Sequence, residues 1–213
     1  MSKTQYTYAV ARIRALEVSL FSASTIEQLI ACKNSESCLR FLQDKGWGGN
    51  DVPMDADAIL TREREKIWET IEEMHVDMDV FNVLSYTNWF HNLKAAVKEV
   101  CTGKSGGKIF FEGTPIPKEE MLRIIREKDY KALPENMQAA AEEAVETLLH
   151  SGDGQLCDII IDRAAMEAIK EAGRKSQDDI IRDYAESTVA VANIKIAVRA
   201  AKTAKSLEIM KRA

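Results

Sequence analysis

The chain has 213 residues, which is enough for one sizeable domain or two small ones. Hydrophobic residues make up 46% and charged residues 30%, while 10 glycines and 4 prolines are too few for a turn-rich β-sandwich. The net charge of -5 argues against nucleic acid as the main partner, because a nucleic-acid binder presents a basic face. The chain has no apolar run of about 18 residues and no signal-peptide core, so we expect a cytosolic protein.

In the first half of the chain, apolar residues recur at steps of three and four, which predicts helices. Ser24 and Glu27 form a capping box for a short second helix, and Gly46 is expected to end the third. The predicted helices span residues 6–20, 24–30, 35–45 and 57–74.

The second half divides at residues that typically begin or end helices. The expected starts are Asp79, Pro117, Pro134 and the capping box Ser176–Asp179. The expected stops are Gly103, Gly152 and Gly173. We count about eight helices and no convincing strand pair, so the predicted fold class is all-α.

The stretch CTGKSGGK, residues 101–108, contains the G-K-S end of a phosphate-binding loop. The full motif needs a glycine five positions before Gly103, where Lys98 stands, and it needs a preceding strand, where a helix is predicted. We therefore interpret Gly103 as the end of a helix, followed by a loop that includes a short extended piece, KIFFEG. No direct ATP binding is expected.

The cysteines and histidines do not form a metal-site pattern. Cys32 and Cys38 are the closest cysteine pair, with five residues between them, and no C-x-x-C motif occurs. We expect reduced, mostly buried cysteines, and neither a metal nor a cofactor.

Two segments of the chain are similar to each other. Residues 90–98 are FHNLKAAVK and residues 191–199 are VANIKIAVR, with Asn92 matching Asn193 and Lys94 matching Lys195. This similarity predicts a repeated helical unit, and the alternative is a chance likeness of two alanine-rich helices. Because asparagine is a poor helix-interior residue, we expect a shared structural role, in which a buried amide bonds the end of a neighbouring helix.

Further stretches occur in an order that is characteristic of one family. They are YTYAVARIRALEVSL (6–20), TIEQLIACKNSESCLRFLQDKGWG (25–48), YTNWFHNLKAAVK (86–98), GTPIPKEEM (113–121), LPENMQAAAEEAVE (133–146), DIIIDRAAMEA (158–168) and the second N-I-K segment (193–199). Together they resemble the family of C subunits of A/V-type ATPases and ATP synthases, whose eukaryotic V-type member is the d subunit. Each stretch is weak alone, but their order makes the resemblance specific over nearly the whole chain.

The resemblance implies an all-helical, funnel-like fold of three similar units. Residues 1–103 would form the first part, ending with the Asn92 helix, and residues 104–213 the second, ending with the Asn193 helix. One continuous domain is the alternative. Members of the family are longer than this chain, so a third unit is expected to be missing.

The same resemblance implies a non-catalytic subunit of the central stalk. Such a subunit joins the soluble rotor shaft to the membrane rotor ring of an ion-pumping ATPase, on the cytoplasmic side of the membrane and peripheral to it. Its partners would be the shaft subunits and the ring. The alternatives are a helical scaffold of another complex, or a helical enzyme using His91, Asp158 and Asp162, which nothing in the sequence brings together.

Partner contacts are predicted at two places. Trp47 lies in a glycine-rich loop, where it either contacts a partner or packs locally, while Trp89 is expected in the core. Basic residues recur at helical spacing near the C-terminus, as a solvated face or as a docking strip for an acidic partner or an anionic membrane rim. They are Lys195, Arg199, Lys202 and Lys205.

Overall fold

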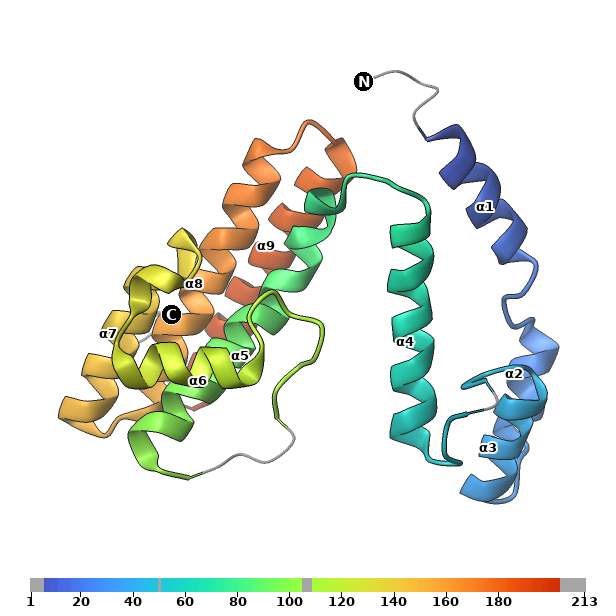
Figure 1. The fold of residues 1–213 in the computed structure, drawn as a ribbon, viewed down its shortest axis with the longest axis horizontal. Helices are drawn as coiled ribbons and strands as arrows, with labels where there is room; N and C mark the ends of the chain where they lie inside the picture. The colour runs from blue at the N-terminus through green and yellow to red at the C-terminus, as the bar shows by residue number, and fades with distance from the viewer. Residues whose placement is uncertain (1–5, 50, 105–108, 204–213) are drawn as a thin grey trace. The chain divides into compact units, whose positions relative to one another are not determined.

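The computed structural model describes residues 6–49, 51–104 and 109–203. It divides the chain into two compact units, Met1–Met78 and Asp79–Ala213, and each is described here by itself. The described residues form nine α-helices and two 3₁₀-helices and contain no strand, which confirms the all-α class (Figure 1).

The first unit contains four helices and a small core. Its buried hydrophobic side chains, among the described residues, are Ile59 and Met74. The apolar stripe predicted on the first helix lies at the surface, as Val10, Ile13 and Leu16 are all exposed. The helices are α1 (Thr7–Glu17), α2 (Ala23–Ile30), α3 (Ser35–Asp44) and α4 (Ala56–Glu73).

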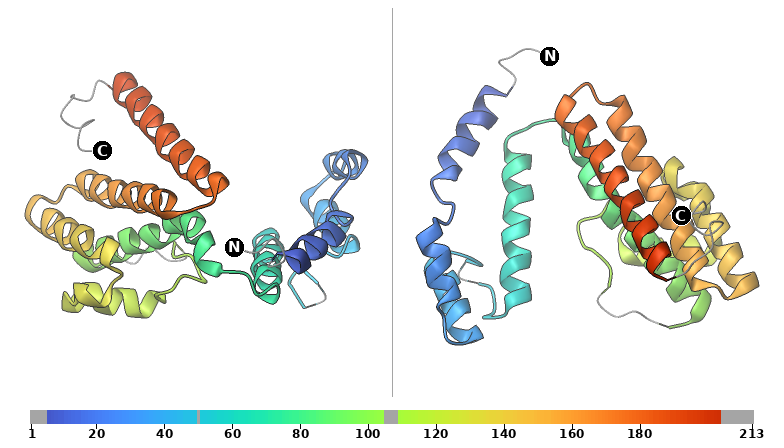
Figure 2. Two further views of the ribbon diagram at one scale, coloured as in Figure 1. Left: turned by 90° about the horizontal axis from the view of Figure 1, so that it is seen from above. Right: turned by 180° about the vertical axis from the view of Figure 1, so that it is seen from behind.

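The second unit is the larger one. Seen from above, α6, α5, α8 and α9 follow one another as layers, with α9 at the outer edge (Figure 2). Helix α5 packs against α6, α7 and α8, and α8 packs in turn against α7 and α9. The helices are α5 (Asn82–Thr102), α6 (Lys118–Glu127), α7 (Glu135–Ser151), α8 (Gly154–Lys175) and α9 (Asp179–Lys202), with the 3₁₀-helices Met78–Phe81 and Tyr130–Ala132.

The core of this unit is built around α5. Phe90, Leu93 and Val97 are fully buried on one face of α5, and they lie in one cluster with Met137 of α7 and Ile161 of α8. Burying each such side chain stabilises the fold by about 1.5–3 kcal/mol. Trp89 packs against the same cluster, as predicted.

Several predicted helix ends are confirmed. Gly103 ends α5 and Gly152 ends α7, both in the left-handed conformation with φ of 68° and 66°. Glycine adopts this conformation without the steric cost that a Cβ imposes. Pro117 and Pro134 stand directly before α6 and α7. At a helix start the backbone N–H has no partner within the helix, so its absence in proline costs no hydrogen bond.

Three predicted caps are wrong. Ser22, and not Ser24, caps α2 by accepting a hydrogen bond from the Thr25 backbone N–H. Asp178 caps α9 where Ser176 was expected, because its carboxylate accepts from the Ile180 N–H at 2.9 Å. Asp79 lies inside the 3₁₀-helix that precedes α5, which has no side-chain cap. At the starts of α2 and α9, Ser22 and Asp178 fit the cap geometry better than the predicted residues.

Gly173 does not end α8, which continues to Lys175. The glycine lies where α8 meets α9, and a Cβ built on it would stand 2.4 Å from the Cβ of Ala185. Its role is therefore close helix packing rather than helix termination.

All four cysteines are free, but only Cys157 is buried, so the expectation of mostly buried cysteines is wrong. The boundary between the compact units, after Met78, differs from the predicted division of the repeat after residue 103. The predicted repeat units stay a prediction.

Candidate interaction surfaces

Asn92 holds the chain segment between α5 and α6. Its buried side-chain amide donates to the carbonyl oxygen of Phe111 at 2.8 Å, and its carbonyl oxygen accepts from the Phe111 N–H at 2.8 Å. The amide also donates to the hydroxyl of Thr114 at 3.1 Å. The predicted buried amide is thus present, although it bonds an irregular segment and not a helix end.

Asn193, the matching residue of the second copy, is in a different environment. It is exposed on α9, and its side chain makes no hydrogen bond within the part of the chain that the structure describes. The proposed equivalence of the two asparagines therefore stays a prediction.

Helix α9 leaves most of its apolar side chains at the surface. Ala185 and Ala200 are its buried residues among those described, and both are small. Larger apolar side chains lie exposed along the helix: Tyr184 (40%), Val191 (46%), Ile194 (63%) and Val198 (48%). A row of exposed apolar side chains along one helix is typical of a protein contact.

The predicted basic strip lies on the same helix. Lys195, Arg199 and Lys202 are exposed, and none of them forms an ion pair with any residue that the structure describes. Lys205, the fourth member, falls outside the described residues.

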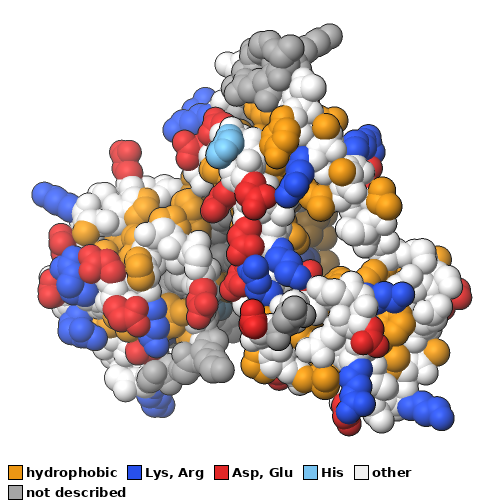
Figure 3. Space-filling model, turned by 45° about the vertical axis from the view of Figure 1, so that its right-hand side comes forward, with side chains coloured by type: hydrophobic (Ala, Val, Ile, Leu, Met, Phe, Trp, Pro, Cys, Tyr) orange, Lys and Arg blue, Asp and Glu red, His pale blue; other side chains and the backbone are white. Residues whose placement is uncertain are grey.

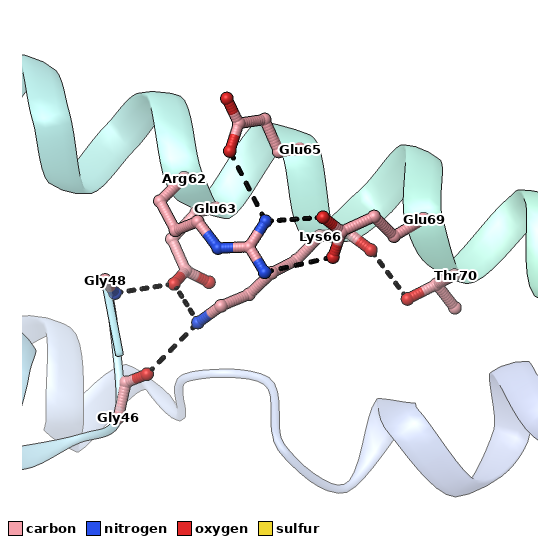
Figure 4. A network of polar contacts seen from close by, with 8 residues as sticks. All are labelled: Gly46, Gly48, Arg62, Glu63, Glu65, Lys66, Glu69 and Thr70. Atoms are coloured by element: carbon pink, nitrogen blue, oxygen red, sulfur yellow. Dashed lines mark hydrogen bonds and ion pairs between the residues drawn. The ribbon is translucent and has the colours of Figure 1, made fainter. Parts of the chain in front are cut away.

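The loop that carries Trp47 is held by side chains of α4, which bond its neighbours Gly46 and Gly48 (Figure 4). Glu63 accepts a hydrogen bond from the Gly48 N–H at 2.7 Å, and Lys66 donates to the Gly46 carbonyl oxygen at 3.3 Å. Lys66 and Glu63 also form an ion pair at 2.6 Å. The two side chains therefore bond the backbone on both sides of Trp47, at Gly46 and at Gly48.

The indole of Trp47 is half-buried against Phe21, with ring centroids 5.1 Å apart. Local packing therefore explains part of its surface, and contact with a partner stays a prediction.

Helix α4 also carries a network of charged side chains, in which hydrogen bonds from Arg62 hold the pKa of the Glu69 carboxyl below its usual value. On the face drawn in Figure 3, basic, acidic and apolar side chains are interspersed, and neither sign of charge covers that face.

The model of the ATP synthase (C/AC39) subunit family matches residues 9–213. The chain belongs to this family. A similar protein, the C subunit of the V-type sodium ATPase of Enterococcus hirae, is 24% identical over 166 residues. The matched part is 76% of this chain and 51% of that protein, so the chain spans about half the length of this relative. No solved structure matches the chain.

The residues of the rival enzyme hypothesis have other partners in this C/AC39-family chain. Asp162 pairs with Lys94 at 2.5 Å and Asp158 pairs with Lys98 at 2.6 Å. His91 lies 2.9 Å from the carbonyl oxygen of Ile109. These contacts join α5 to α8 and to the segment after α5, and they do not place the three side chains in one acid–base site.

Metal-binding clusters and membrane spans are both absent from the described part of this family member. No group of three or more His, Cys, Asp or Glu side chains that could hold a metal ion occurs among the described residues. No helix among them is both long and apolar enough to cross a bilayer.

Proposed function

We propose that the chain is a non-catalytic central-stalk subunit of an A/V-type ATPase. In this role it links the soluble rotor shaft to the membrane rotor ring on the cytoplasmic side, and couples ATP hydrolysis or synthesis to ion transport. The observation that carries the proposal is the family match over residues 9–213. The relative from Enterococcus hirae is itself named as a subunit of a V-type sodium ATPase.

Two structural features support a mechanical role. The core around α5 is packed from four helices, α5, α6, α7 and α8, and close packing resists deformation under torque. Apolar side chains on α1 and α9 lie at the surface, where they can make the contacts that a linking subunit needs. The basic strip on α9 and Trp47 are the proposed contact points.

Binding to the shaft is the first test. We expect the full chain to co-elute with the matching rotor-shaft subunits at physiological salt. Serum albumin, a second acidic protein, serves as the control for nonspecific association. Binding to another complex without binding to the shaft would favour a helical scaffold and contradict the proposal.

Coupling is the second test, in membrane vesicles that carry the matching ATPase. Depleting the subunit should abolish ATP-driven ion uptake while the detached catalytic sector continues to hydrolyse ATP, and adding the purified chain should restore uptake. Uptake that persists without the subunit would contradict a linking role. Hydrolysis of ATP by the pure chain would contradict the non-catalytic assignment.

A further inference from the structure

Helix α9 exposes the positions that α5 buries. The repeat places Val191, Ile194 and Val198 of α9 at the positions of Phe90, Leu93 and Val97 of α5, and the same offset of 101 residues, extended toward the helix starts, places Tyr184 at the position of Val83. The four α5 side chains are at most 2% exposed, whereas the four α9 side chains are at least 40% exposed. The same type of surface is therefore covered in one copy and open in the other.

The side of α9 that does pack is the opposite one. Ala185 is buried at the contact with α8, and its counterpart on α5, Leu84, is 40% exposed. At Ala185, the contact with α8 therefore uses a position whose counterpart on α5 is exposed, and it leaves free the α9 side chains that match the core residues of α5.

Basic residues of the two helices differ in the same way, since they are paired on α5 and exposed on α9. On α5, Lys94 and Lys98 pair with Asp162 and Asp158, two carboxylates one turn apart on α8. The repeat places Lys195 and Arg199 of α9 at the positions of the two lysines. Both are exposed, and neither has an ion-pair partner within the described part of the chain.

We propose that α9 is a docking face for a helix of a partner protein. This helix presents two carboxylates one turn apart beside an apolar stripe. The carboxylates pair with Lys195 and Arg199, and the stripe covers Val191, Ile194 and Val198. Helix α8 makes contacts of the same kind with α5, because its two carboxylates pair with lysines of α5 and its apolar side chains cover the apolar face of α5. The inference is drawn from the repeat and its contacts, and it does not rest on the proposed role in a rotary ATPase.

Other occupants fit less well. In a second copy of this chain, Asp158 and Asp162 already pair with their own α5, so α8 is not free to cover α9. An anionic lipid surface would neutralise the basic groups, but the paired spacing of Lys195 and Arg199 matches carboxylates held on a helix.

The test uses the full chain and a synthetic peptide of residues 154–175, which is the α8 helix itself, under reducing conditions. We expect saturable binding by fluorescence anisotropy, weakened about tenfold when the chain carries Lys195→Glu and Arg199→Glu. A peptide with Asp158→Lys and Asp162→Lys should bind the reversed chain about as well as the native pair. The control chain, Arg126→Glu with Lys131→Glu, has the same net charge and should bind like the unchanged chain.

Four results would overturn the proposal. They are the absence of peptide binding up to millimolar concentration, binding that charge reversal leaves unchanged, a dimer that Ile194→Glu dissociates, and binding to vesicles of phosphatidylcholine and phosphatidylglycerol in place of the peptide. Because no ATPase subunit is present in this test, its failure would leave the proposed coupling role standing.

Discussion

Asn92 shows how one polar residue positions a segment inside an apolar core. Asparagine carries a donor and an acceptor on one amide, so it can satisfy both the N–H and the C=O of one backbone residue. It does this for Phe111, with both distances at 2.8 Å. The segment therefore lies against α5 without an unpaired backbone group at Phe111.

Asn92→Ala should lower the free energy of unfolding by about 1–3 kcal/mol, because both backbone groups of Phe111 lose their partner. Asn193→Ala is the matched control, with an expected change within about 0.5 kcal/mol because its side chain is exposed. Urea denaturation measures both. Equal losses for the two variants would contradict the role of the Asn92 amide.

Cys157 links burial to the pH dependence of stability. Burial in the core raises the pKa of its thiol to about 11, and the nearby Asp158 carboxylate adds to the effect. Because the folded pKa lies above the unfolded value, the neutral thiol favours the folded state. This contribution is fully present below about pH 9 and is lost as the pH rises toward 11.

Between pH 8.5 and 10.5, the unchanged chain should therefore lose more stability than Cys157→Ala, by roughly 2 kcal/mol at the upper limit. Urea denaturation across this pH range measures the difference in slope. Tyr130, whose pKa burial also raises, is present in both chains and cancels in the comparison. Parallel pH profiles would show that the buried thiol does not titrate as described.

At the scale of elements, the crossing of α8 and α9 depends on two small side chains. Gly173 of α8 and Ala185 of α9 are both buried, and the helices approach so closely that one added methyl group would overlap. Helix packing distance is set by the side chains at the contact, so this pair fixes how α9 lies on α8.

Gly173→Ala should destabilise the chain by about 1–2 kcal/mol in thermal or urea unfolding. Overpacking against Ala185 costs more than the roughly 1 kcal/mol gained in helix propensity. Adding Ala185→Gly should recover much of the loss. Gly154→Ala, in the same helix but with open space around it, is the control and should be neutral or stabilising. Stabilisation by Gly173→Ala would contradict the close crossing.

At the scale of the whole molecule, the two compact units differ in how much apolar surface they bury. The core cluster of the second unit joins α5, α6, α7 and α8, whereas Ile59 and Met74 are the buried hydrophobic residues described in the first. Local stability follows buried apolar contact, so the first unit should open more easily.

Hydrogen–deuterium exchange should show this difference along the chain. We expect backbone amides of α1, α2 and α3 to exchange much faster than those of α5, α7 and α8, at a pH where exchange follows local opening. Exchange of the urea-unfolded chain supplies the intrinsic rates as the control. Equal protection in both units would contradict the small core of the first.

Sequence alone determined the features that depend on neighbouring residues. The helical period gave the all-α class, and Gly103 and Gly152 marked the ends of two helices, because φ near 70° is a local requirement that glycine meets. The caps at Ser22 and Asp178 were missed by two positions, because serine and aspartate occur several times near each helix start.

Tertiary structure alone decided which apolar stripes form a core. The stripes of α1, α5 and α9 have similar periods, yet only that of α5 is buried. Gly173 likewise resembled a helix end, and only the approach of α9 shows it to be a packing residue. The physical reason is that burial belongs to a pair of surfaces, whereas a sequence pattern describes only one of them.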